Sequence, residues 1–160
     1  RTVRAAREAG FEDIRVVLRP GDLELQRMLT SLGIRLIVHP GWREGLGTSI
    51  ALGTLSLPPG MPGVLLLACD QPALTPELLS RLAIAIEGPK SRVCCAYAGT
   101  LGIPALFGSD WFPRLRSLTG DRGAKDLLRD GDVKAIPFEA GAFDLDTPED
   151  LERWLNLGAG

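Results

Sequence analysis

The sequence predicts an α/β domain with a mostly parallel sheet and helices on both of its faces. Short apolar runs that end at Gly or Pro alternate with longer amphipathic runs, which is typical of strand–helix–strand units. Residues 64–69 have no polar face, as expected of a central parallel strand. The chain has 160 residues, 45% of them hydrophobic and 24% charged, which is the size and composition of one globular domain.

The first half of the chain contains clear start and stop signals. Gly10 and Gly33 each follow an amphipathic run, and glycine commonly comes just after a helix. Asp22 is expected to cap the second of these helices, because aspartate accepts hydrogen bonds from first-turn amides. Pro20 and Pro40 close two short apolar runs. These signals predict helices over 2–9, 23–32 and 48–55, and strands over 14–18, 34–38 and 64–69.

The second half repeats the alternation. Thr75 and Thr147 are each followed by Pro and Glu, which is the pattern of a helix N-cap with proline at the first helical position. Residues 102–107 are expected to be a loop that leads into a packed helix or strand. The remaining pattern predicts helices over 76–86, 111–118, 123–129 and 148–157, and strands over 93–97 and 133–136.

Charge and cysteine content exclude several function classes. The formal net charge is -2, so no broad basic face for nucleic acid or an anionic membrane is expected. No apolar run approaches the ~20 residues of a membrane span, and no signal peptide is visible. Three cysteines and one histidine complete neither a disulfide framework nor an ordinary zinc site. We therefore expect a cytoplasmic protein with buried, reduced cysteines.

Acidic side chains stand where a parallel sheet places its ligands, at the carboxyl ends of strands. Asp70 ends the most apolar run, and a half-desolvated carboxylate needs hydrogen bonds, a cation or a metal. Asp144 and Asp146 alternate with Phe143 and Leu145, so both carboxylates share one face of an extended segment. A hard cation such as Mg²⁺, with phosphate oxygens, would offset their repulsion. The alternatives are a turn cap at Asp70 and an acidic first turn of the last helix.

A glycine-rich segment precedes the third predicted helix. Gly45 and Gly47 would let the backbone approach a ligand, and Thr48 and Ser49 offer hydroxyls near a helix N-terminus. The spacing matches neither a dinucleotide fingerprint nor a P-loop, and a plain flexible loop with a helix cap is the alternative. The turn at 119–125, considered alone, is an ordinary solvated turn.

Together, five segments resemble the MobA-like nucleotidyltransferases, and within them most closely the molybdenum cofactor cytidylyltransferases. In chain order they are GLGTSI (45–50), ACDQP (68–72), GIPALF (102–107), GDRGA (120–124) and DLDTPED (144–150). The resemblance implies a Rossmann-like three-layer sandwich of the nucleotide-diphospho-sugar transferase type, with residues 1–160 as a single nucleotidyltransferase domain.

The resemblance also implies an activity. The phosphate of molybdenum cofactor would attack the α-phosphorus of CTP in the presence of Mg²⁺, forming a cytosine dinucleotide and releasing pyrophosphate. The expected partners are CTP, the phosphorylated pterin and a molybdoenzyme, with no nucleic acid and no membrane. A guanylyltransferase or other nucleotidyltransferase of this fold, and a non-catalytic cofactor-binding module, remain alternatives.

The roles implied by the resemblance are assigned motif by motif. Asp70 and Asp146 would be the catalytic, metal-binding carboxylates, with Asp144 as the weaker candidate for the second position. The residues that would bind the nucleotide are Gly45, Gly47, Thr48, Ser49 and Asp70. The residues that would face the second substrate are Gln71, Pro72, Gly102, Pro104, Gly120, Asp121 and Gly123.

Two features depart from the family pattern. The family opens with a strand and a glycine-rich loop that cradles the triphosphate and supplies an Arg and a Lys, and the 160 residues do not contain it. We therefore expect a domain that lacks its first strand and is incomplete at its N-terminus. In addition, Ile103 stands before Pro104, where close cytidylyltransferase relatives carry His.

Overall fold

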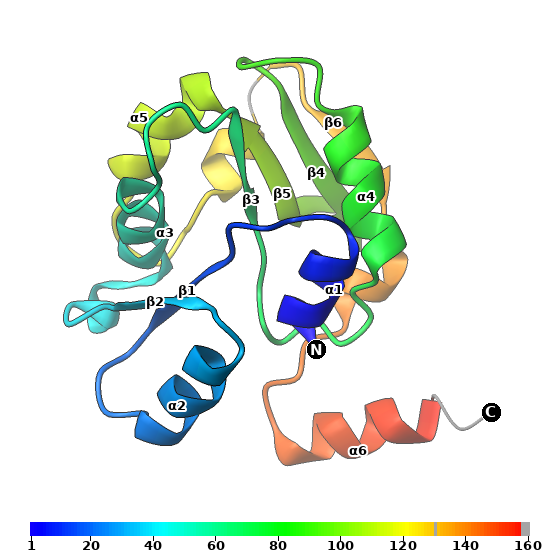
Figure 1. Ribbon diagram of the computed structural model, residues 1–160. Helices are drawn as coiled ribbons and strands as arrows, with labels where there is room; N and C mark the ends of the chain where they lie inside the picture. Colours follow the sequence, from blue (N-terminus) through cyan, green and yellow to red (C-terminus); the bar gives the residue numbers. More distant parts are fainter. Residues whose placement is uncertain (130, 158–160) are drawn as a thin grey trace.

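The computed structural model describes residues 1–129 and 131–157 (Figure 1). The first half contains α1 (Thr2–Glu8), β1 (Arg15–Leu18), α2 (Leu23–Ser31), β2 (Arg35–Val38), η1 (Trp42–Glu44), α3 (Leu46–Leu55) and β3 (Gly63–Leu66). The second half contains α4 (Pro76–Ala85), β4 (Arg92–Tyr97), β5 (Thr100–Gly108), η2 (Ser109–Trp111), α5 (Phe112–Arg116), η3 (Lys125–Leu128), β6 (Lys134–Pro137), η4 (Glu139–Ala142) and α6 (Pro148–Leu157). The α/β class expected from the sequence is confirmed.

The strands form two sheets. β1 and β2 pair in parallel, and the second sheet has the order β3-β5-β4-β6. β5 runs antiparallel to β3 and to β4, whereas β6 is parallel to β4. The four-stranded sheet is therefore mixed. The hairpin from β4 to β5 reverses the direction of the chain within it.

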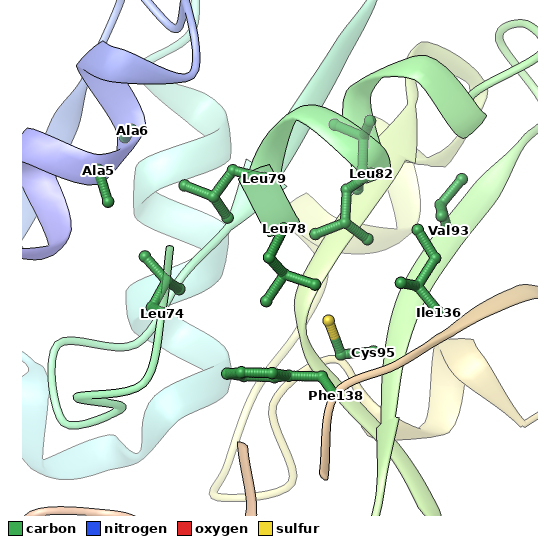
Figure 2. Close-up of a cluster of buried hydrophobic side chains, with 11 residues drawn as sticks. Ala5, Ala6, Leu74, Leu78, Leu79, Leu82, Val93, Cys95, Ile136 and Phe138 are labelled. Atoms are coloured by element: carbon green, nitrogen blue, oxygen red, sulfur yellow. The ribbon is translucent and has the colours of Figure 1, made fainter. Parts of the chain in front are cut away.

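Helices cover both faces of the larger sheet. Figure 2 shows α1 and α4 on one face, where the fully buried Leu79 and Leu82 belong to the same hydrophobic cluster as Val93 and Cys95. The neighbouring Cys94 belongs to the cluster on the other face, under α5 and η3. Successive strand residues point to opposite faces, so the Cys94-Cys95 pair contributes to both core layers. Each fully buried leucine contributes roughly 1.5–3 kcal/mol to the free energy of folding.

The expected helix caps are confirmed. The Asp22 carboxylate accepts from the Leu25 amide at 3.1 Å, and the Thr75 hydroxyl accepts from the Leu78 amide at 3.3 Å. At the start of α6, Thr147 and Asp150 each accept a hydrogen bond from the other's backbone amide, at 3.2 and 3.0 Å. These contacts satisfy first-turn amides that have no partner within the helix. No helix in residues 1–129 and 131–157 combines the length and apolar composition of a membrane span.

The run at 64–69 differs from the expected central parallel strand. β3 ends at Leu66, and the only strand that pairs with it in the described chain is the antiparallel β5. Leu66 pairs with Ala105, so the next β5 residue is Pro104, which has no amide to donate. The chain leaves the sheet there, and Cys69 is exposed instead of buried. Residues 102–107, expected as a loop that leads into a packed element, lie within β5 itself.

Candidate active site

A backbone contact brings the two acidic segments together. Asp70 lies in the loop after β3, and the amide of Leu145 donates to its backbone carbonyl oxygen at 2.8 Å. Along 143–146 the exposure alternates: Asp144 and Asp146 are exposed, whereas Phe143 and Leu145 are partly buried. Phe143 packs on Trp154 of α6 with ring centroids 5.7 Å apart. The expected alternation of the two aspartates is confirmed, and their segment lies directly beside Asp70.

The charges in this region influence one another. The pKa of the Asp144 carboxyl is raised, most strongly by loss of surrounding water. Repulsion from Asp70 and, to a smaller extent, from Asp146 raises it further, whereas Lys125 lowers it. The pKa of Tyr97 is raised by burial, while the Gln71 hydrogen bond lowers it and Asp144 and Asp70 raise it further. Asp70, Asp144 and Asp146 therefore form one acidic cluster, with Lys125 as a nearby positive charge.

The acidic cluster suits a hard divalent cation. One carboxylate oxygen of Asp70, Oδ1, is buried and has no hydrogen-bond partner in the described chain. Carboxylate oxygens are preferred ligands of Mg²⁺, which usually takes one or two of them and fills its other positions with water and phosphate oxygens. Three or more His, Cys, Asp or Glu side chains arranged for a metal do not occur in residues 1–129 and 131–157. A cation held by one or two carboxylates takes most of its ligands from substrate and solvent.

The glycine-rich segment packs against the turn at 119–121. The amide of Gly47 donates to the carbonyl oxygen of Gly120 at 2.8 Å, and a Cβ on Gly47 would lie 2.6 Å from the Thr119 carbonyl oxygen. Gly45 has φ 107°, and a Cβ there would lie 2.5 Å from Asp121 Oδ1. The close approach that these glycines allow is thus made by the protein's own turn. Two segments expected to form the site, 45–49 and 120–123, are in contact.

Thr48 is occupied by internal hydrogen bonds. α3 begins at Leu46, two residues before the expected start, so Thr48 lies in its first turn. The Thr48 hydroxyl donates to the Gly45 carbonyl at 2.8 Å and lies 2.9 Å from Nε2 of His39, which is only 8% exposed. With its proton directed to Gly45, the hydroxyl accepts from His39. The histidine holds the loop to the end of β2, and no local sequence pattern indicated this contact. Ser49, next in the helix, is partly buried.

Most residues expected to face the second substrate lie beneath the surface. Pro72, Gly102, Pro104 and Gly123 are buried, and Gly120 and Asp121 are exposed. Gln71 is 4% exposed, and its Nε2 donates to the carbonyl oxygens of Ile103 and Gly141 at 3.2 and 3.1 Å.

Tyr97, which sequence reasoning did not single out, joins this buried cluster. Its hydroxyl donates to the Ile103 carbonyl at 3.0 Å. An aromatic residue at the end of a strand was its only signal in the sequence.

Comparison with known proteins identifies the class of domain and then the family. Residues 1–135 match the model of the MobA-like NTP transferase domain. The purine catabolism protein PucB of Bacillus subtilis is 31% identical over 115 residues, which cover 68% of this chain and 55% of PucB. The chain thus spans about half the length of that curated relative. The chain belongs to the MobA-like NTP transferase domain family.

Two solved structures share the fold of this chain. The crystal structure of Rv0371c from Mycobacterium tuberculosis superimposes with a TM-score of 0.81 at 26% identity, covering 97% of this chain and 82% of that one. A complex of Rv0371c with manganese has a TM-score of 0.80 at 26% identity, covering 97% and 84%. The fold expected from the resemblance, that of a nucleotide-diphospho-sugar transferase, is confirmed.

Proposed function

We propose that the protein is a nucleotidyltransferase that uses Mg²⁺ and CTP to transfer CMP to the phosphate of molybdenum cofactor. The single observation that carries this proposal is the pairing of Asp70, with its partnerless buried oxygen, and the segment that holds Asp144 and Asp146. Family membership supports nucleotidyl transfer, and the five motifs favour the cytidylyl variant.

The reaction needs little covalent chemistry from the protein. An acceptor phosphate oxygen attacks the α-phosphorus of CTP, and the bond from that phosphorus to the pyrophosphate oxygen breaks. Such transfers depend mainly on positioning and on charge stabilisation, so no protein nucleophile is required. Mg²⁺ would neutralise phosphate charge, held by Asp70 and Asp146, with Asp144 as the alternative second carboxylate. Lys125 adds a positive charge beside Asp144.

The two substrates are expected to bind at the contacting segments 45–49 and 120–123 and at the buried residues next to them. We propose that the nucleotide is bound by Gly45, Gly47, Thr48, Ser49 and Asp70. Exposed Gly120 and Asp121 would contact the phosphorylated pterin directly. Gln71, Pro72, Gly102, Pro104 and Gly123 would shape the floor of that site, because they are buried.

The triphosphate loop of the family is not among these 160 residues. In the described chain, β1 pairs only with β2, and β3 pairs only with β5. We propose that residues 1–160 form one nucleotidyltransferase domain. A cytoplasmic location and a molybdoenzyme as recipient of the product are parts of the same proposal.

Two observations favour a different acceptor or base. The name of the relative PucB refers to purine catabolism, and Ile103 replaces the histidine of close cytidylyltransferases. GTP with molybdenum cofactor, or another phosphorylated acceptor, is therefore the second candidate. A non-catalytic cofactor-binding module is the remaining one.

Pyrophosphate release tests these candidates directly. The full polypeptide is assayed with Mg²⁺, molybdenum cofactor and either CTP or GTP, beside Asp70→Asn and the distant control Asp110→Asn. We expect release with CTP, a loss of at least about 100-fold in Asp70→Asn, and no change in the control. Release with GTP alone would select the guanylyltransferase. Substrate binding without release would select the non-catalytic module.

A further inference from the structure

A largely buried polar cluster lies near the acidic cluster. It consists of Gln71 and Tyr97, together with the backbone carbonyls of Ile103 and Gly141. The Gln71 amide donates to both carbonyls, and the Tyr97 hydroxyl donates to that of Ile103. These bonds connect the loop after β3, the end of β4, β5 and η4. Because the Gln71 side chain is almost fully buried, its hydrogen bonds are shielded from competing water.

Two glycines make room for the tyrosine ring. A Cβ on Gly102 would collide with the Tyr97 hydroxyl, and a Cβ on Gly141 would lie 3.1 Å from Tyr97 Cδ1 and collide with the Phe138 ring. Tyr97 and Phe138 meet edge to face, with ring centroids 6.2 Å apart. The cluster is therefore closely packed, and the Tyr97 hydroxyl is confined to the position from which it reaches Ile103.

Gln71 and Asp70, which are consecutive, hold the segment that carries Asp144, the alternative second carboxylate. The Gln71 side chain binds the Gly141 carbonyl, and the Asp70 carbonyl accepts from the Leu145 amide. Asp144 lies between these two attachment points. Asp146 lies beyond the second one, directly before the N-cap of α6. The position of Asp144 relative to Asp70 is thus fixed on both sides.

We propose that Gln71 is a positioning residue which, with Tyr97, holds residues 141–145 against the Asp70 loop and keeps Asp144 beside Asp70. This deepens the proposed function, on which its catalytic meaning rests: Gln71 acts on the metal and nucleotide through Asp70 and the alternative second carboxylate, Asp144, and not by contact with substrate. The buried amide donates to fixed carbonyls, so removing it would let the 141–145 segment move away from Asp70.

The test uses Gln71→Met, which keeps the side-chain length and removes both donors, and the matched control Gln26→Met at a partly buried position on α2. Two quantities are measured on the full chain: the hydrogen-exchange rate of the Leu145 amide, and the affinity for Mn²⁺ alone by calorimetry. In Gln71→Met we expect Leu145 exchange to rise about tenfold and Mn²⁺ affinity to fall about tenfold, with exchange at Cys95 in the core unchanged. The control should change neither quantity.

The outcomes separate this proposal from the proposed function. Unchanged Leu145 exchange in a folded Gln71→Met variant overturns the positioning role, whatever the metal does. Faster exchange with unchanged Mn²⁺ affinity overturns the link to the carboxylate pair. If the wild type does not bind Mn²⁺, the metal part of the proposed function fails, and the exchange rates still decide whether Gln71 holds the segment. Should Gln71→Met not fold, Tyr97→Phe replaces it, with a smaller increase in Leu145 exchange expected and no increase as the contrary result.

Discussion

The amide of Gly47 donates to the carbonyl oxygen of Gly120 at 2.8 Å, so the first turn of α3 and the turn at 119–121 form one unit. The contact explains why a segment with a ligand-binding appearance is so rich in glycine. The backbones of residues more than 70 positions apart are in direct contact here. A side chain at Gly47 would therefore have no room.

Gly47→Ala should therefore destabilise the protein although it lies in a helix. Alanine normally gains about 1 kcal/mol over glycine in a helix interior. Here the new Cβ would lie 2.6 Å from the Thr119 carbonyl oxygen, and such overpacking costs about 1–3 kcal/mol. The control is Gly53→Ala in the same helix, whose Cβ would meet only Val17 Cγ2 at 3.3 Å. Urea unfolding should show Gly47→Ala as the less stable variant, and equal stability would contradict the packing argument.

The three cysteines should react very differently with alkylating reagents. Burial raises the pKa of Cys94 to about 11 and that of Cys95 to about 12, so neither thiolate is populated or accessible near neutral pH. Cys69 is exposed in the loop after β3, although partial burial and then the neighbouring Asp70 raise the pKa of its thiol. Iodoacetamide at about pH 8 should add one label to the native protein and three after denaturation, as counted by intact mass. Three labels on the folded protein would show that the sheet core opens readily.

Asp144→Asn should stabilise the metal-free protein at neutral pH. The pKa of Asp144 is raised above its ordinary 3.8, first by lost hydration and then by Asp70 and Asp146. The native state therefore binds more protons than the unfolded state from about 3.8 upward, and stability falls as pH rises through that window. Asp144→Asn should therefore have a higher free energy of unfolding than the wild type above the folded-state pKa of Asp144. The difference should vanish at pH values below about 3.8.

Unfolding free energies measured with a chelator present, from acid to neutral pH, check this dependence. Asp110→Asn, on η2, serves as the control. A loss of stability at neutral pH in Asp144→Asn would contradict the repulsion described for the acidic cluster.

Local signals were sufficient for much of the fold. Asp22, Thr75 and Thr147 marked helix starts because their side chains bond to amides three residues away, within the same short stretch of sequence. The alternation at 143–146 was equally local. Both the caps and the shared face of Asp144 and Asp146 could therefore be predicted before the structure was known.

Long-range pairing could not be predicted. The apolar run at 64–69 fits a strand of either direction, and its antiparallel partner β5 comes only after α4 and β4 in the sequence. Likewise, Gln71 meets Tyr97 and Gly141 across 26 and 70 residues. Family resemblance located the Gln71 motif but assigned its side chain to substrate, whereas its donors are directed to backbone carbonyls.

In the proposed reaction, Asp70 is the carboxylate that binds the cation and, through it, the nucleotide. Calorimetric titration of CTP into the full polypeptide, with Mg²⁺ and with a chelator, tests this in the wild type, Asp70→Asn and Asp110→Asn. The predicted result is Mg²⁺-dependent binding that is lost in Asp70→Asn and retained in Asp110→Asn. Binding that is independent of Mg²⁺, or equal in wild type and Asp70→Asn, would show that the carboxylates at this edge of the sheet are structural.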